Sequence, residues 1–368
     1  MMSFISAIGV AVPEHVFSQP VIASFMERTM QPDYTANRKL HAIFRASGIE
    51  TRHSVLDDYG KQSDYSFYPN TKNFEPFPST QARLEAYRKH ALPLSLRAIE
   101  NCFSQQPAIN RNDITHLIQV SCTGMYAPGL DIDLIRQLKL NEHVQRTCIN
   151  FMGCYAAFNA LKLADAICKA ENHAAVLIVC TELCTLHFQK EPTEDNLLAN
   201  ALFADGAGAM LVTSSPQPGW NIMPEHFHNG LAFNGKEHMA WDIGNHGFEM
   251  KLSTYVPDTI RTGIKKLTTE LLNQFQKNIN DISFFAIHPG GKKILEAIEQ
   301  ELGISPEQNK PAYAVLKKYG NMSSATILFV LHHIMQQFQH RDKDKLILSF
   351  AFGPGLTLES MLLKTHYQ

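Results

Sequence analysis

The sequence predicts an α/β fold in which two similar halves each alternate strands with helices. Continuous apolar runs such as Ala174–Cys180 alternate with segments that carry apolar residues every three or four positions. This alternation is typical of mostly parallel sheets covered by helices. The second observation is an internal repeat: Cys154 follows Ser121 by 33 residues, and Asn321 follows His288 by the same interval. Equal spacing of this kind indicates a duplicated unit.

Length and composition set the broad class of the protein. With 368 residues, of which 45% are hydrophobic and 18% charged, the chain is long enough for two sizeable cores. The segment S-S-P-Q-P-G after Thr213 predicts a boundary between one half over 1–215 and another over 220–368. A net charge of −2 provides no basic field for nucleic acid.

Targeting signals and metal sites are not predicted. No apolar run approaches the roughly 20 residues that span a bilayer, and the N-terminus lacks a secretion pattern. The odd count of seven cysteines fits reduced thiols better than a disulfide framework. Their spacing does not match a zinc site. We therefore expect a cytoplasmic protein that binds neither nucleic acid, membrane nor metal.

The first half reads as strands and helices up to the boundary. An apolar run closed by proline predicts an opening strand, helical periodicity predicts helices, and a stretch of Tyr, Asn, Asp, Phe and Pro without a period predicts a packed loop. In chain order these are a strand over Ile5–Val12, one helix over Val21–Arg45, a loop over Asp57–Pro78, a helix over Ser79–Phe103 with a kink at Pro93, a strand over Thr115–Ser121, a helix over Asp131–Leu140, a helix within Phe151–Ala170, and strands over Ala174–Cys180 and Ala207–Thr213.

The second half repeats this organisation. Ser283–Ile287 is an apolar strand that ends in H-P-G-G, and Lys292–Leu302 has helical periodicity. Gly320 and Asn321 then precede small residues and an apolar run, as Gly153 and Cys154 do in the first half. A final pair of strands follows in KLILSFAFGPGLTLESMLL.

The pair Gly153-Cys154 is the best candidate for a nucleophile. A thiol at the head of a helix lies near unpaired backbone N–H groups, so we expect a lowered thiol pKa. The missing side chain of Gly153 leaves room for a substrate. The alternative is a buried structural cysteine, which is the common fate of a free cysteine.

His288 and Asn321 complete a reactive set with Cys154. If the halves pack about a pseudo-twofold axis, the helices headed by Cys154 and Asn321 meet at one site. An imidazole can pair with the thiolate, and a carboxamide can donate hydrogen bonds to an oxyanion. Carbon–carbon bond formation uses such a set, and so does a papain-type hydrolase. Residue types alone leave the two even, and the two matching halves favour condensation.

Five motifs in register resemble the type III polyketide synthases, the chalcone synthase-like members of the thiolase fold. They are G-C-Y-A at Gly153, A-L-F-A-D-G-A-G-A at Ala201, I-H-P-G-G at Ile287, Y-G-N-M-S-S-A at Tyr319 and F-G-P-G-L-T-L-E at Phe352. The resemblance implies a homodimer of five-layered αβαβα subunits with two pseudo-symmetric halves. It further implies that a starter acyl group is loaded onto Cys154 and extended by iterative decarboxylative Claisen condensation with malonyl-CoA, aided by His288 and Asn321, without a cofactor.

The resemblance also implies substrate-binding positions. The gatekeeper phenylalanine falls on Phe203, and Met250 stands where plant members carry a second one. Cys122 stands near a usual threonine, and Ala127 replaces a methionine that reaches into the partner subunit. The turn that holds Gly353 and Gly355 is expected to shape the cavity and to donate a backbone N–H to the acyl oxyanion.

The CoA entrance departs from the family pattern. Lys39 matches one of the basic residues that relatives use for the CoA phosphates, but Ala42 and Ala46 replace two others. Nearby arginines are candidate substitutes, namely Arg38, Arg45 and Arg52. The other possibility is that an acyl carrier protein delivers the starter as its thioester.

Two further functions compete with iterative synthesis. A single-round condensing enzyme of the ketoacyl synthase III kind uses the same Cys-His-Asn set, so the number of extender units in the product separates the two. A catalytically silent scaffold is the third hypothesis. The presence of all three reactive residues argues against the scaffold.

Overall fold

The computed structural model describes residues 2–231, 239–252 and 256–368. Its strands are β1 (Phe4–Ala11), β2 (His15–Ser18), β3 (Thr51–Ser54), β4 (His116–Ser121), β5 (Gln145–Asn150), β6 (Ala175–Leu183), β7 (Asp205–Thr213), β8 (Trp220–Leu231), β9 (Met239–Gly244), β10 (Gly247–Leu252), β11 (Ile282–Ile287), β12 (Leu346–Gly353) and β13 (Thr357–Tyr367). Its α-helices are α1 (Gln19–Met30), α2 (Tyr34–Ala46), α3 (Thr80–Phe103), α4 (Leu130–Leu138), α5 (Ala156–Ala170), α6 (Glu194–Leu202), α7 (Val256–Asn273), α8 (Lys292–Leu302), α9 (Lys310–Tyr319) and α10 (Thr326–Met335).

The main sheet contains the same strand order twice. Its order is β11-β12-β13-β8-β1-β7-β6-β4-β5, so β4-β6-β7-β1 in one half corresponds to β11-β12-β13-β8 in the other. Each series begins with a parallel pair and continues with two antiparallel pairs. The halves meet where Ile5 of β1 pairs with Ile222 of β8.

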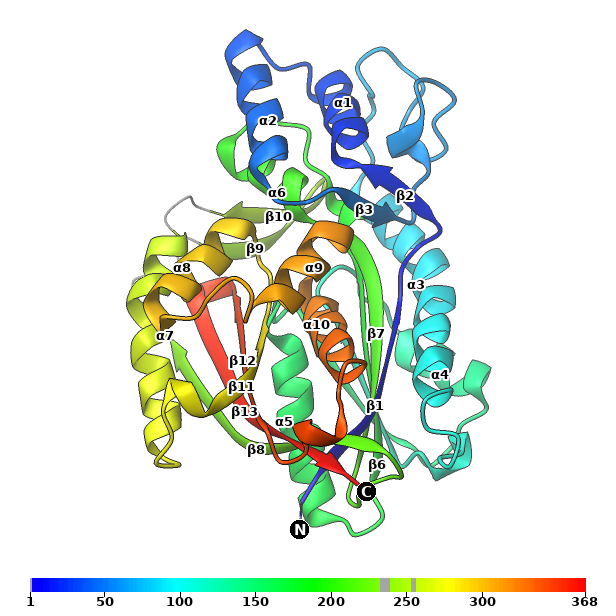
Figure 1. Ribbon diagram of the computed structural model, residues 1–368. Coiled ribbons are helices and arrows are strands. Elements are labelled where there is room, and N and C mark those ends of the chain that lie inside the picture. The colour runs from blue at the N-terminus through cyan, green and yellow to red at the C-terminus, as the bar shows by residue number, and fades with distance from the viewer. Residues whose placement is uncertain (1, 232–238, 253–255) are drawn as a thin grey trace.

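The prediction of mostly parallel sheets is wrong, because antiparallel pairs join β6 to β7 and β12 to β13. A parallel neighbour requires a crossover connection over one face of the sheet. The helix between β6 and β7, α6, instead contacts α1 and α2, beyond the strand ends in Figure 1. A single short 3₁₀ turn over Pro354–Leu356 connects β12 to β13. In both places the chain turns back and returns antiparallel.

Helices α5 and α10 lie at the centre of the molecule, and one buried core joins both to the strands of both halves. A second core packs α1, α3 and α4 on the first half, and a third packs α7, α8 and α9 on the second. Burial of these apolar faces is the main stabilising contribution. The two halves of the main sheet thus form two layers, with α5 and α10 between them and the other helices outside. This arrangement of five layers confirms the predicted thiolase-like α/β fold. Among the described residues, no helix combines the length and apolar character needed to cross a membrane.

The predicted helix over Val21–Arg45 is two helices. Gln31 ends α1 with a left-handed backbone, at φ 47°. Asp33 then caps α2 by accepting a hydrogen bond from the backbone N–H of Ala36 at 2.8 Å. The break lies at Pro32, which disfavours helical geometry in the residue before it. By contrast, α3 continues through Pro93 as one helix.

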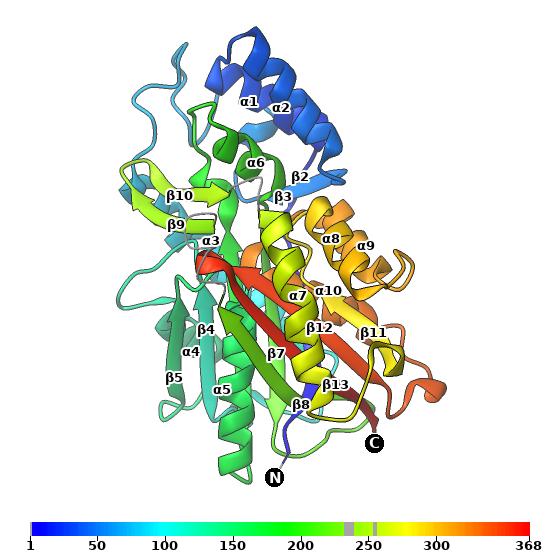
Figure 2. The same cartoon turned by 90° about the vertical axis from the view of Figure 1, so that its left-hand side faces the viewer.

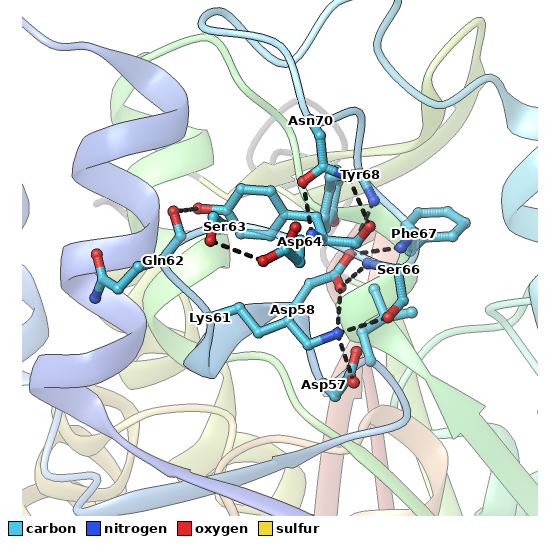
Figure 3. A network of polar contacts seen from close by, with 12 residues as sticks. Asp57, Asp58, Lys61, Gln62, Ser63, Asp64, Ser66, Phe67, Tyr68 and Asn70 are labelled. Atoms are coloured by element: carbon cyan, nitrogen blue, oxygen red, sulfur yellow. Dashed lines mark hydrogen bonds and ion pairs between the residues drawn. The ribbon is translucent and has the colours of Figure 1, made fainter.

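The segment after β3 is a packed loop, as predicted (Figure 3). The buried carboxylate of Asp58 accepts hydrogen bonds from three successive backbone N–H groups, those of Ser66, Phe67 and Tyr68. Lys61 pairs with Asp57 at 2.8 Å. The ring of Tyr68 is buried beside α1. These contacts hold the loop against α1 and form one side of a cavity described below.

Candidate active site

Three residues from separate elements line one cavity. Cys154 lies two residues before the start of α5, and His288 follows the last residue of β11. Asn321 precedes a 3₁₀ turn over Ser323–Ala325 that leads into α10. The Sγ atom of Cys154 lies 4.0 Å from Oδ1 of Asn321. The fold therefore brings together the three residues that the 33-residue spacing singles out.

Hydrogen bonds on both sides hold the Asn321 amide. Its Oδ1 accepts from the backbone N–H of Ser323 at 2.9 Å, and its Nδ2 donates to the carbonyl of Gly290 at 3.3 Å. Its backbone N–H donates to Leu202, and its carbonyl accepts from Ala204. Asn321 consequently lies beside Phe203 in a parallel β-bridge. The amide is fixed relative to the wall of the cavity.

His288 is 1% exposed, yet neither of its ring nitrogens has a hydrogen-bond partner among the described residues. Burial lowers its pKa to about 3, so the ring is neutral at physiological pH. A buried polar group without a partner is unfavourable by roughly 1–3 kcal/mol. Such a group facing a cavity indicates a position where a ligand supplies the partner.

The pKa of the Cys154 thiol differs from the prediction. Burial raises its pKa to about 12, while a hydrogen bond with Ser323 lowers it and the carboxyl of Glu182 raises it. We predicted a lowered pKa from the helix terminus. Because α5 begins only at Ala156, exclusion of water outweighs the terminus. The free site therefore contains a neutral thiol and a neutral imidazole.

Gly153 lines the same cavity as Cys154, and its backbone conformation requires a glycine. Its φ of +86° favours glycine, and a Cβ there would lie 2.2 Å from Cδ of Pro354. The position that a Cβ of Gly153 would take is thus filled by Pro354 of the turn between β12 and β13, while the glycine itself lines the cavity with Cys154. Pro354 of this turn and Phe352 of β12 line the cavity. Gly353 instead packs against Tyr155, and Gly355 has a left-handed backbone at φ 73°.

The predicted substrate-binding side chains form part of the wall. Phe203, Met250 and Cys122 all line the cavity. Trp241 of β9 also lines it, and its Nε1–H donates to the carbonyl of Cys122 at 2.8 Å. The rings of Phe203 and Trp241 have centroids 6.4 Å apart. Sequence reasoning missed Trp241, although the chain has only two tryptophans.

Glu182 is a second residue that sequence reasoning missed. It is fully buried, and burial raises its pKa to about 7 against hydrogen bonds that lower it. Its carboxylate accepts from the hydroxyls of Thr123 and Ser324 and from the backbone N–H of Cys122. The glutamate is the one charged residue in the apolar run AVLIVCTEL, which is a detectable signal. It supports the segment that carries Cys122 and the turn that carries Ser323.

The predicted CoA-binding residues lie elsewhere, on the surface of α2. Lys39 and Arg45 line a separate groove with Arg38 and His41. Lys39 forms an ion pair with Glu194 of α6 at 3.1 Å. The α6 helix ends at Leu202, next to Phe203. One end of α6 thus lies beside the groove, and its other end lies beside the cavity.

Comparison with known proteins assigns both halves. Residues 2–216 match the model of the N-terminal domain of chalcone and stilbene synthases, and residues 228–366 match that of their C-terminal domain. The chain is 32% identical to "Probable polyketide synthase 1" of Dictyostelium discoideum, over 98% of this chain and 11% of that protein's length. It is 29% identical to "Alpha-pyrone synthesis polyketide synthase-like Pks18" of Mycobacterium tuberculosis, over 98% of this chain and 91% of that protein.

A solved structure shows the same architecture. The C-terminal type III polyketide synthase domain of Steely1, a type I/III hybrid from Dictyostelium, superposes with a TM-score of 0.90. It is 32% identical to the chain, and the match covers 99% of both.

Proposed function

The chain belongs to the chalcone and stilbene synthase family of type III polyketide synthases, and we propose that it extends a starter acyl group on Cys154 with malonyl units. It is therefore a condensing enzyme of the acyltransferase type, and members of this family act on CoA thioesters. One observation carries the assignment of residues. The imidazole of His288 leaves both nitrogens unpartnered in the cavity that Cys154 and Asn321 also line.

Loading starts from the neutral pair. A proton moves from Sγ of Cys154 to a ring nitrogen of His288, and the thiolate attacks the carbonyl carbon of the acyl thioester. The new bond joins Sγ to that carbon, and the bond between the carbon and the CoA sulfur breaks. CoA leaves as the thiol with the proton from His288. The acyl group remains on Cys154.

In the extension step, Asn321 and His288 donate hydrogen bonds to the thioester oxygen of malonyl-CoA. Nδ2 of Asn321 carries two hydrogens, of which one points to Gly290, so the other is free for the thioester oxygen. An N–H of His288 is the second donor. The bond to the malonyl carboxylate breaks, CO₂ leaves, and the electron pair forms an enolate that both donors stabilise. The enolate carbon attacks the acyl carbonyl, and the Cys154 thiolate leaves, ready for another round.

The apolar wall supports the decarboxylation step. Phe203, Trp241 and Met250 exclude water from one side of the cavity. A carboxylate beside such a wall is less stable than neutral CO₂, so the wall favours its loss. This chemistry uses side chains and CoA thioesters alone, with neither a metal nor a prosthetic group.

The route of the starter into the site is part of the proposal. The α2 groove gathers the cationic side chains of Arg38, Lys39 and Arg45, which suits the phosphates of CoA or of a carrier-protein arm. Lys39 would exchange Glu194 for a phosphate. Turnover of acyl-CoA in the absence of carrier protein would favour the CoA route.

A homodimer is the assembly that we propose. β5 is an edge strand of the main sheet, and most of its residues are exposed. An unpaired edge is a site for pairing with another chain. Met125 and Met152, exposed by 37% and 36%, lie in the segments that follow β4 and β5. Light scattering after gel filtration would detect the dimer. A cytoplasmic location stays a prediction.

Product analysis tests the proposed function. Purified protein receives acyl-CoA and malonyl-CoA, and mass spectrometry counts the extender units. Products with two or more units are expected. Products with a single unit across many starters would favour the single-round enzyme, and absence of an acyl adduct on Cys154 would favour the scaffold. The comparisons with known proteins favour neither alternative.

Asn321→Ala tests whether Asn321 acts in extension and not in loading of the starter. The variant is expected to form the acyl-enzyme at the normal rate and to lose extension, because its amide serves the malonyl thioester. Intact-protein mass spectrometry follows loading, and product formation follows extension. An equal loss of both steps would show that the assigned role is wrong.

A further inference from the structure

A second cavity adjoins the proposed active site. Four side chains line both cavities, namely Cys184, Phe203, Trp241 and Met250. The rest of the second wall comes from α1, β2, β3, the 3₁₀ turn over Asp58–Gly60, α6, β10 and the segment after β6. The mechanism proposed above uses none of these additional residues.

The walls of the second cavity are largely apolar. Phe17, Ile22, Met26, Tyr59 and Phe188 line it. The ring of Tyr59 packs against Phe25, its hydroxyl donates to the carbonyl of Thr185, and the loop held by Asp58 begins beside it (Figure 3). A cavity of this kind, next to the thiol that carries the acyl group, suits the methylenes of an acyl chain.

Most polar groups of this wall already have protein partners. Nε2 of His187 donates to the carbonyl of Thr123, and its Nδ1 accepts from the backbone N–H of Phe248. Thr185 donates to Asp205, and Asn200 donates to the carbonyl of Gln189. These groups therefore do not require a ligand as a hydrogen-bond partner.

Arg52 is different. It is 3% exposed, its Nε donates to Gln19 at 2.8 Å, and its Nη1 donates to the carbonyl of Phe203 at 2.6 Å. Its Nη2 is buried without a partner in the described part of the chain. Among those residues the charge of Asp205 favours the protonated guanidinium without a hydrogen bond to it, and the ring of Phe44 lies 5.6 Å away. Burial lowers its pKa to about 10, so the guanidinium remains charged at physiological pH.

A buried cationic N–H without an acceptor is unfavourable, and an oxygen acceptor removes the penalty through a charge-assisted hydrogen bond. We propose that the second cavity holds the distal part of the starter acyl group, and that Nη2 of Arg52 binds an oxygen atom on that part. The ligand class is an acyl thioester whose chain carries a hydroxyl, carbonyl or carboxylate away from the thioester. This inference rests on the proposed function, because the starter must be attached to Cys154.

The bond from Arg52 to Phe203 adds a consequence. The guanidinium that binds the distal oxygen also donates a hydrogen bond to the backbone carbonyl of Phe203, which lines both cavities. That residue is bridged to Asn321. Arg52 thus contacts the starter as a specificity residue and also positions Phe203.

Matched starters test the inference. Unbranched acyl-CoA starters of several lengths are compared with their ω-hydroxy and ω-carboxy forms, and the rate of acyl-Cys154 formation is followed by intact-protein mass spectrometry. The wild type is expected to prefer one oxygenated form over the plain chain of the same length by about tenfold or more. Absence of any such preference overturns the role of Arg52. The hydroxy and carboxy arms show which oxygen is bound.

Two variants separate the parts of the proposal. Arg52→Met, which removes the N–H donors, is expected to abolish the preference, and the ratio of rates cancels any general loss of activity. Arg136→Met, at an exposed arginine of α4, is the control and should keep the preference. Ala199→Phe narrows the second cavity from α6 and leaves Arg52 itself unsubstituted. It should slow long starters about tenfold relative to the shortest one.

The outcomes distinguish this inference from the proposed function. If no starter forms an adduct on Cys154, the proposed function fails. If adducts form but Ala199→Phe leaves the ratio of long to short starters unchanged, the second cavity does not hold the chain. If Arg52→Met does not fold, the wild-type preference and Ala199→Phe still decide the question.

Discussion

The two halves share a strand order but differ at equivalent positions. Ser121 ends β4 in the first half, and its hydroxyl accepts a hydrogen bond from Tyr87 at 2.9 Å. The equivalent residue in the second half is His288, which has no partner for either ring nitrogen among the described residues. Cys154 and Asn321 are likewise equivalent. Duplication supplies two similar helix ends, and in the proposed mechanism different side chains at these ends act as the nucleophile and as hydrogen-bond donors.

The largest effect is expected at Cys154. Cys154→Ala removes the acyl carrier and should lower polyketide formation by at least about a thousandfold. Cys168→Ala, near the other end of α5, is the matched control and should retain activity. Product formation is measured by chromatography, and circular dichroism checks the fold. Near-normal activity of the Cys154 variant would refute the division of roles between the halves.

The next effect sharpens the comparison directly. His288→Ala should slow malonyl decarboxylation about a hundredfold or more, because one enolate donor is lost. Ser121→Ala changes the equivalent position and leaves Tyr87 with a weaker contact to Thr181 at 3.4 Å. It should lower the free energy of unfolding by about 1 kcal/mol and leave decarboxylation within a few-fold. Similar losses of decarboxylation in both variants would show that the two positions do not differ in role.

The resting protonation of the pair can be tested by pH. Because burial raises the pKa of Cys154 to about 12, the thiolate fraction is small at pH 7 and grows about tenfold per pH unit below that pKa. The rate of iodoacetamide modification of Cys154 should therefore increase from pH 7 to pH 10. A plateau reached below pH 8 would instead support the lowered pKa that helix position alone predicts.

The smallest effect concerns packing between the halves. Gly153→Ala places a methyl group 2.2 Å from Pro354 at a φ of +86° and should lower the free energy of unfolding by about 2–4 kcal/mol. Gly219→Ala has a similar φ of +92° but nothing within 4 Å, so about 1 kcal/mol is expected. Chemical denaturation measures both. Equal losses would show that the contact with Pro354 is unimportant.

Local patterns were sufficient for much of the fold. The equal spacing of Ser121 to Cys154 and of His288 to Asn321 predicts two equivalent units, because spacing within a repeat is preserved along the chain. Strand direction was not predictable in the same way. Whether β7 runs parallel or antiparallel to β6 depends on where α6 packs, and its contacts with α1 and α2 join distant segments.

The residues of the site also fall into those that a local motif identifies and those that only folding brings to it. Cys154, His288 and Asn321 were found because each occurs in a recognisable local motif. Trp241 and Arg52 were not placed in the site, because nothing in their own segments indicates which cavity they line. Trp241 reaches the carbonyl of Cys122 across the fold, and Arg52 reaches that of Phe203.

The sequence alone specified the candidate reactive side chains, their order along the chain and the family. Only the tertiary structure decided how they ionise and what surrounds them. Pro354, far from Gly153 in the chain, fills the space that glycine leaves open. Burial makes the Cys154 thiol and the His288 imidazole neutral. The physical reason is that a pKa depends on the exclusion of water, and water is excluded by side chains that only folding brings together.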